Sequence, residues 1–385
     1  MTAAFTLHGA ASVFVALAFL LFPAACLGQS ETWDTTRDMT DGTEHAEELS
    51  RHKDGKVNYV FLPIPQSNPA IGSGATLVGL ALYNPNQSRQ PWVSGIGVMR
   101  AGDSRATGIV QQANLMNSRL RLLAALGHAN LDLKFYGIGA DAGERGTSIP
   151  LEQTGTGGFV QALYEVGTHW FLGLRYQNMY LRSKFDLSQA LALGAVIPEV
   201  DLQRRTVSIG PALEYDSRDD NFYPTRGVSA KANLNFYTEG LGSDVSFRQF
   251  SASWNRYWPM AADRVLAARV AGCTVSGNVP FSDLCMYGRN NDLRGYTTGQ
   301  YRDRAMLAAQ MEMRWRLAPR WGGVAFAGMG SIGSSLSDLP DEKILPSIGA
   351  GLRWQASKDY KVNVSLDVAV TRDDHAVYLY VGEAF

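Results

Sequence analysis

Long apolar runs are missing from this sequence beyond Phe22. A helix that crosses a bilayer needs about 20 consecutive apolar residues, and no later segment supplies them. The hydrophobic content of 45% is instead spread along the chain, and the mean hydropathy is -0.12. A helical membrane protein is therefore excluded.

An excess of charge of one sign is also missing. The chain carries 35 Lys and Arg residues against 36 Asp and Glu residues, and both signs are scattered along it. Nucleic-acid-binding domains concentrate basic residues on one face or in one segment. We therefore expect no nucleic-acid partner.

Histidine and cysteine are scarce, with six and three residues. No histidine stands beside a Ser or Cys in a way that suggests a nucleophile and its base. Gly137 and Gly139 follow an expected strand, but no helix comes next and the spacing does not fit a dinucleotide site. The acids Asp216, Asp219 and Asp220 suit turn capping better than cation binding. We expect no enzyme, no cofactor and no metal site.

The beginning of the chain predicts export. Ser12 to Phe22 is an apolar run of secretory length, and small residues follow it up to Gly28. Lipidation of Cys26 is an alternative, although the preceding residues lack the usual leucine. We assign residues 1–28 to a signal peptide, 29–56 to a polar periplasmic tail and 57–385 to one β domain. In an oxidising compartment Cys273 and Cys285 can form a disulfide, with two free thiols as the alternative.

From residue 57 onward the chain has the composition of strands and tight turns. Segments of about ten residues alternate apolar and polar side chains and are separated by turn residues, which predicts about 16 strands. The expected strands are 72–83, 92–101, 105–116, 119–126, 129–138, 154–166, 170–181, 203–216, 227–239, 244–257, 264–275, 305–317, 321–331, 345–355, 360–370 and 375–385.

Connection length separates a membrane barrel from a soluble sandwich, which would show the same alternation. The long connections 140–153, 182–202, 276–304 and 331–346 all follow odd-numbered strands in this count. Short connections such as 102–104, 167–169 and 356–359 follow even-numbered ones. Transmembrane barrels have long surface loops and short periplasmic turns. We therefore predict an all-β fold, a transmembrane antiparallel β-barrel.

Four motifs in this frame carry a resemblance to a known family. They are Lys134-Phe135-Tyr136-Gly137-Ile138-Gly139, the turn from Tyr215 to Gly227, Leu293-Arg294-Gly295-Tyr296 in the sixth surface loop, and the terminal Phe385. Together they resemble the bacterial surface-antigen barrel of the BamA/TamA superfamily of outer-membrane proteins over residues 57–385. The turn residues that carry the second motif are Asp216, Arg218, Asp219, Pro224 and Gly227. The tail is too short to hold the family's periplasmic repeat modules, so we expect none in this chain.

The resemblance implies that the sixth surface loop folds into the barrel lumen. Arg294, Gly295 and Tyr296 then form its tip, and the guanidinium needs a carboxylate on the lumen wall. Alternation in 305–317 turns Glu312 inward, which makes it the first partner, with pairing to a neighbouring arginine as the alternative. The family's second acid would stand at Gly328. Its place is therefore empty or is filled from elsewhere, by Glu214 or Asp367.

The final residues resemble the family's C-terminal targeting signal, with Tyr380 and Phe385 as its aromatic positions and Glu383 as a departure. The implied function is non-enzymatic: assisting protein insertion, protein translocation or lipid transport at the outer membrane of a Gram-negative bacterium. Its expected partners are outer-membrane lipid, a separate periplasmic partner or client protein, and the assembly machinery during biogenesis. The alternative is a passive pore or surface antigen whose sixth loop is a structural plug.

Overall fold

The computed structural model describes residues 57–68, 70–86, 92–186, 201–220, 223–287, 292–357, 362–372 and 374–385. The predicted signal peptide and tail, residues 1–56, lie outside the described residues. Strands dominate the described part, and the prediction of an all-β antiparallel fold is confirmed. None of the helices in these ranges is long and apolar enough to span a membrane.

The strands of the main sheet are long and follow the order of the chain. They are β1 (Asn58–Asn68), β2 (Gly72–Tyr83), β3 (Trp92–Ala101), β4 (Ser104–Leu115), β5 (Leu120–Phe135), β6 (Ile149–Gly167), β7 (Trp170–Phe185), β8 (Asp201–Asp216), β9 (Gly227–Tyr237), β10 (Phe247–Ala261), β11 (Arg264–Gly277), β14 (Ala305–Ala318), β15 (Trp321–Gly333), β16 (Leu345–Ser357), β17 (Val362–Thr371) and β18 (His375–Val381). Short elements lie in the connections: α2 (Ala140–Glu144), η2 (Glu239–Leu241), η3 (Phe281–Asp283), β12 (Cys285–Met286) and β13 (Arg302–Asp303).

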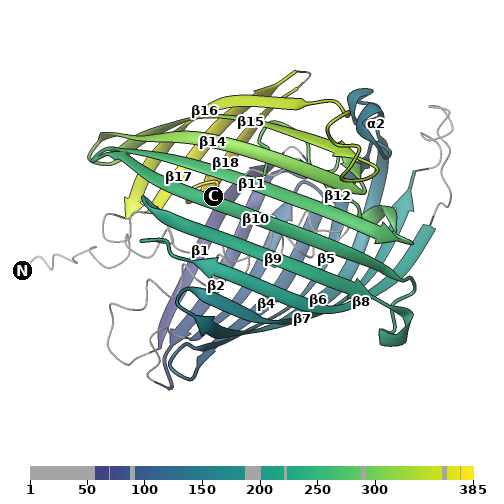
Figure 1. Ribbon diagram of the computed structural model, residues 1–385, viewed down its shortest axis with the longest axis horizontal. Coiled ribbons are helices and arrows are strands. Elements are labelled where there is room, and N and C mark those ends of the chain that lie inside the picture. The colour runs from purple at the N-terminus through teal and green to yellow at the C-terminus, as the bar shows by residue number, and fades with distance from the viewer. Residues whose placement is uncertain are drawn as a thin grey trace, which may run out of the picture.

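Neighbours in the chain pair antiparallel around a closed barrel, which Figure 1 shows with its long axis horizontal. The barrel closes where β1 meets β18. Closure is narrow, because Ser67 opposite Leu379 is the register pair between these strands, whereas β1 pairs with β2 along its whole length. We call the contact between β1 and β18 the seam.

Two strand assignments are wrong. The first strand is β1, not the segment beginning at Gly72, so Gly72, Gly74 and Gly79 lie in β2 and away from the seam. The expected strands 119–126 and 129–138 are one strand, β5, which continues through Gly127. Both errors have the same cause, because the prolines in β1 and the glycine in β5 are residue types that usually mark the end of a strand. β1 accepts Pro63 and Pro65 because it pairs along its length on one side only, and a proline has no N–H to offer the other side.

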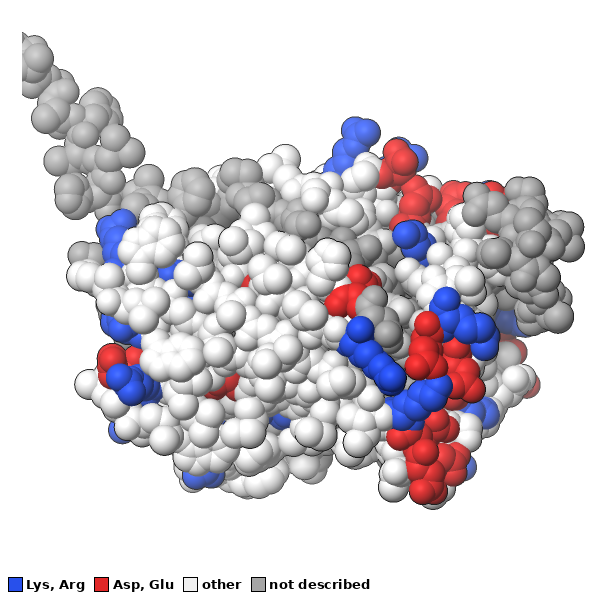
Figure 2. All heavy atoms as spheres, turned by 90° about the horizontal axis from the view of Figure 1, so that it is seen from above, with Lys and Arg blue, Asp and Glu red and all other residues white. Residues whose placement is uncertain are grey.

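Side chains alternate between an outer apolar face and an inner polar face. On β17, Val368 is 45% exposed, whereas its neighbour Asp367 is 0% exposed and points inward. The same alternation repeats on β7, where Leu172 and Leu174 are exposed and Arg175 is buried. Figure 2 shows the result on one face: most charged side chains gather at one end, a smaller group lies at the other end, and a broad, largely uncharged region covers the middle.

Long connections lie together at one end of the barrel, the end that carries α2 and β12 on the right of Figure 1. The β3–β4 turn at Gly102 is also at this end, since β4 begins where Ser104 Oγ accepts a hydrogen bond from Asp132 N near the end of β5. Its predicted place at the opposite end is therefore wrong. His128, expected in a turn, lies within β5 and contacts Thr156 Oγ1 at 2.7 Å.

Candidate functional site

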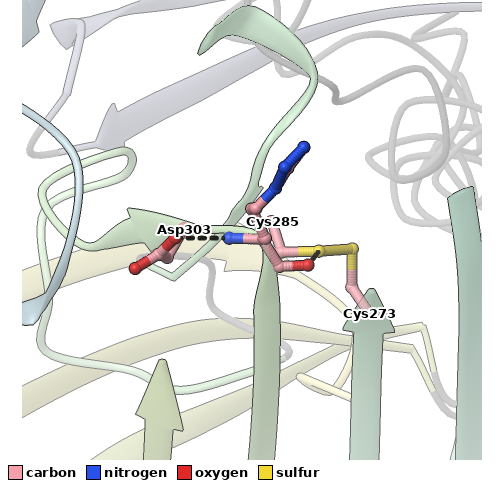
Figure 3. Close-up of a disulfide and its surroundings, with 4 residues drawn as sticks. Cys273, Cys285 and Asp303 are labelled. Carbon is pink, nitrogen blue, oxygen red and sulfur yellow. Dashed lines mark hydrogen bonds between the residues drawn. A yellow bond between two sulfur atoms is a disulfide. The ribbon is translucent and has the colours of Figure 1, made fainter. Parts of the chain in front are cut away.

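The connection between β11 and β14 turns back into the barrel. Its described residues around the Leu293-Arg294-Gly295-Tyr296 tip are buried, with Leu293 and Arg294 at 0% exposure. The strands β12 and β13 form a small hairpin at its base, where Cys285 pairs with Asp303. A disulfide joins Cys285 to Cys273 near the end of β11, with the Cα atoms 5.8 Å apart (Figure 3). The loop is thus fixed to the barrel wall next to its own entry point.

Arg294 is the centre of the site. Its Nη2 donates to Glu312 Oε2 and its Nη1 to Asp367 Oδ2, both at 2.6 Å. Its Nε donates to Gln310 Oε1 at 3.1 Å. The guanidinium carbon lies 3.4 Å from the ring centroid of Phe326. A buried guanidinium without partners would be costly, and here β14 supplies two partners while β15 and β17 supply one each.

The rest of the tip contacts the remaining strands up to the seam. Gly295 N donates to Tyr378 Oη of β18 at 2.9 Å, and Tyr296 Oη donates to the carbonyl of Pro346 in β16 at 2.7 Å. Gly295 has a φ of +113°, and a Cβ there would lie 2.5 Å from Thr371 Cγ2. Only glycine combines this backbone conformation with so close an approach.

The ion pair continues into a buried network on the same wall. Glu312 Oε1 accepts from Arg314 Nε at 2.6 Å, and Asp367 also accepts from Arg353 Nη1. Arg353 Nε donates to Glu383 Oε2 at 2.8 Å. These arginines and carboxylates alternate, so each buried charge has at least one opposite neighbour. We call Arg294, Glu312, Arg314, Arg353, Asp367 and Glu383 the lumen network.

The structure brings Arg294 together with the acid expected first, Glu312, which also contacts an arginine as the alternative had it. Asp367, one of the two acids named for the vacant family position, contacts Arg294 from β17. The other, Glu214, accepts a hydrogen bond from Gln161 instead. At Gly328 a side chain would crowd Leu293, because a Cβ would lie 2.8 Å from Leu293 Cδ1.

The sequence pattern does not predict the contacts of Arg353 and Glu383. The final strand was expected to reach Phe385, but β18 ends at Val381 and Gly382 has a φ of +88°. The last residues consequently turn inward. In the sequence, Glu383 stands out only as a departure from the targeting signal. That departure is the local feature that could have indicated a different contact for its side chain.

Phe385 lies inside the barrel end. It packs beside Tyr257, Val265 and Ala267 of β10 and β11, and its carbonyl accepts from Arg314 Nη2 at 2.5 Å. Tyr380 Oη also points inward and donates to Asp367 Oδ2 at 2.6 Å. The targeting role of Tyr380 and Phe385 stays a prediction.

The motif turn between β8 and β9 is held by its own acids. Arg218 Nη2 lies 2.6 Å from Asp216 Oδ2, and Asp219 accepts from Thr225 N at 2.9 Å and from Thr225 Oγ1 at 2.5 Å. Burial raises the pKa of Asp219, but these hydrogen bonds outweigh it and hold the pKa below its ordinary value. Pro224 is buried, and Gly227 has a φ of +105°.

This turn also reaches the lumen network. The ring centroid of Tyr223 lies 5.8 Å from Arg314 Cζ, and burial raises the pKa of Tyr223 to about 12. Among the described residues, no group of three or more His, Cys, Asp or Glu side chains is arranged to hold a metal ion.

A family model, the Omp85 superfamily domain, matches residues 72–371. The chain belongs to the Omp85 superfamily. The resemblance to BamA/TamA outer-membrane proteins is thereby confirmed.

Solved structures of two superfamily members show the same fold. One is BamA from Haemophilus ducreyi lacking POTRA domains 1–3, with 14% identity, a TM-score of 0.58, and coverage of 90% of this chain and 78% of that one. The other is CdiB from Escherichia coli, with 13% identity, a TM-score of 0.58, and coverage of 94% and 74%. A search of curated protein sequences found no match.

Proposed function

We propose that this chain is an outer-membrane barrel that assists protein insertion, protein translocation or lipid transport together with a separate periplasmic partner. Superfamily membership and the likeness to BamA and CdiB support this class of function. The barrel spans the membrane with its apolar outer face, and the long connections lie at the cell surface. The observation that carries the proposal is the burial of Arg294 between Glu312 and Asp367.

The exposed side chains support the placement in a membrane. Trp170, Trp321 and Trp354 lie near the end of the barrel away from the long loops, and each is 38–52% exposed. Tryptophan gathers at membrane interfaces because its ring is apolar and its N–H is polar. Above this end, exposed aliphatic side chains cover the strands, as Leu174, Ile348 and Val368 illustrate.

The narrow seam supports a function in which β1 and β18 separate, rather than a barrel that stays closed. β1 and β18 share one register pair, and the proline residues of β1 limit further pairing. The loop tip, in contrast, contacts β14 to β18 and keeps that side of the seam ordered. In this proposal the two end strands part while the loop maintains the rest of the barrel.

The test replaces Arg294 by alanine. Cells lacking the chain receive the wild type, Arg294→Ala, or Arg304→Ala as the control, since Arg304 belongs to the same loop but contacts the Gly277 carbonyl outside the lumen network. The abundance of other outer-membrane proteins and the amount of surface phospholipid are measured. Folding of each barrel is checked by its heat-dependent electrophoretic mobility. We expect Arg294→Ala to behave like the deletion and Arg304→Ala like the wild type.

The second candidate is a passive pore or surface antigen, favoured by the burial of the loop tip as a plug. It predicts that Arg294→Ala changes the conductance of the purified barrel and leaves both cellular measurements unchanged. That pattern would exclude the assembly and transport function.

A further inference from the structure

We propose that the outer face of β3 to β8 binds a glycolipid of the lipid A type, with a phosphate at each end of a sugar headgroup and several acyl chains. This inference rests on the proposed placement in an outer membrane. The lipid site is separate from the loop, the seam and the lumen network.

A concave groove of about 850 Å³ lies on this face. Its walls are large apolar side chains that are 40–54% exposed, so they point away from the lumen. These are Ile109, Leu126, Val160, Tyr176 and Tyr180. Ala124 and Gly158 contribute to its lining with little or no side chain, which leaves room for acyl chains against the sheet. The groove reaches Asn178 and Arg205 at its polar end.

Cations follow the groove toward the loop end of the strands. Residues that pair across neighbouring strands form rows around the barrel. In the first row, Arg205 on β8 stands opposite Tyr180 on β7, and Arg205 Nε donates to Asn178 Oδ1 at 3.2 Å. The second row runs through Arg182, Thr154, Asn130, Arg105 and Arg100 on consecutive strands from β7 to β3. Neither row contains an acid.

The acids lie one row farther from the groove. Lys184, Glu152 and Asp132 stand in that third row, with Asp201 opposite Lys184. Asp201 accepts from Arg182 at 2.6 Å, but the two side chains are 40% and 42% exposed. Asp244 accepts from the backbone N–H of Arg205. An exposed pair of this kind contributes little free energy, so a lipid phosphate can take the place of Asp201 beside Arg182.

The arrangement separates two cationic positions. Arg100 and Arg105 face each other on β3 and β4, and Arg182 and Arg205 lie on β7 and β8. The strands between them carry polar side chains that can form hydrogen bonds: His128, Asn130, Thr154 and Thr156. Strands lie about 4.8 Å apart, so β4 and β7 are separated by about 14 Å.

This spacing matches a headgroup with phosphates at both ends and hydroxyl groups between them. Arginine binds phosphate with two parallel N–H donors, which suits each cationic position. A lipid with a single phosphate would occupy one position and leave the other empty. We therefore assign the site to the bis-phosphorylated glycolipid.

Strand β10, which is separated from β8 by β9, provides a matched control. Arg248 is an exposed cation near the loop end of β10, and its register neighbours are Phe236 and Ser276. It has the same charge and a similar depth along its strand, but no second arginine beside it in the register.

The experiment titrates the purified full chain in detergent with hexa-acylated lipid A and counts bound lipids by native mass spectrometry. Parallel titrations use the same glycolipid without phosphates, and phosphatidylglycerol. The variants are Arg100→Ala with Arg105→Ala, Arg182→Ala with Arg205→Ala, and Arg248→Ala. Heat-dependent mobility shows that each barrel is folded, and Ala124→Phe, which fills the groove without removing a charge, tests the acyl-chain site separately.

We expect one tightly bound lipid A, with affinity about tenfold lower in each double variant, which corresponds to about 1.4 kcal/mol. Ala124→Phe should also weaken binding, and Arg248→Ala should not. Wild-type affinity in both double variants, equal weakening by Arg248→Ala, or equal binding of phosphatidylglycerol would overturn the assignment. The Arg294→Ala experiment changes none of the residues of the lipid site. Failure of the lipid site and failure of the proposed function therefore give different results.

Discussion

Gly295 shows how one residue positions the loop tip. Its φ of +113° and the 2.5 Å distance from its ideal Cβ to Thr371 Cγ2 leave no room for a side chain. We expect Gly295→Ala to displace the tip and to destabilise its docking by about 1–3 kcal/mol, the usual cost of such a backbone conformation in a non-glycine residue. Amide hydrogen exchange of residues 292–298 measures this. Gly146→Ala is the control, because Gly146 also has a positive φ but has open space around it; equal exchange in both variants would contradict the assignment.

Asp283 makes docking of the same loop depend on pH. It lies in η3, and burial raises its pKa to about 6 from 3.8, while a hydrogen bond from Ser282 acts in the opposite direction. The folded loop therefore holds a proton that the undocked loop releases between about pH 4 and pH 6. Its docking free energy is greatest below this range and falls as the pH rises through it, by about 3 kcal/mol in total.

Replacing Asp283 by asparagine removes that ionisation. Protease sensitivity of the loop should then change little between pH 4 and pH 7, and at pH 7 the variant should be the more resistant protein. A wild-type loop with equal sensitivity at both pH values would show that Asp283 titrates normally.

Among the larger elements, the disulfide limits how far the loop can leave the wall. Cys273 and Cys285 are 12 residues apart, and a covalent closure of about this length contributes roughly 2–3 kcal/mol. We expect Cys273→Ser with Cys285→Ser to increase proteolysis of the loop while the barrel keeps its heat-dependent mobility. Reductant should have the same effect on the wild type and none on the double variant.

The sequence predicted elements well where alternation was regular and poorly where the backbone changes direction. Glu312 could be placed on the inner face from its own strand alone. Asp367 could only be named as one of two candidates, because its contact with Arg294 joins residues 73 apart in the chain. Arg353 and Glu383 could not be paired at all, since the turn at Gly382 that brings Glu383 inward looks locally like the end of a strand. Pro63 and Pro65 likewise hid β1, whose strand character comes from pairing with β2.

At the scale of the whole molecule, a cross-link across the seam tests whether β1 and β18 must separate for the proposed function. Ser67 and Leu379 stand directly opposite across it. A disulfide between Ser67→Cys and Leu379→Cys should abolish the proposed activity, and reduction should restore it. The matched control joins Pro65→Cys to Ala75→Cys across β1 and β2, which already pair fully. Full activity of the oxidised seam variant would show that the strands need not separate.

The loop tip also determines which side of the seam is able to move. Through Arg294, Gly295 and Tyr296 a single loop contacts all five strands from β14 to β18. We therefore expect these strands to shift together, with the loop travelling along. β1 pairs with β2 along its whole length, so we expect widening of the barrel to be a hinge motion of β1 and β2. A client entering at the seam would meet a fixed template on one edge and a moving strand on the other.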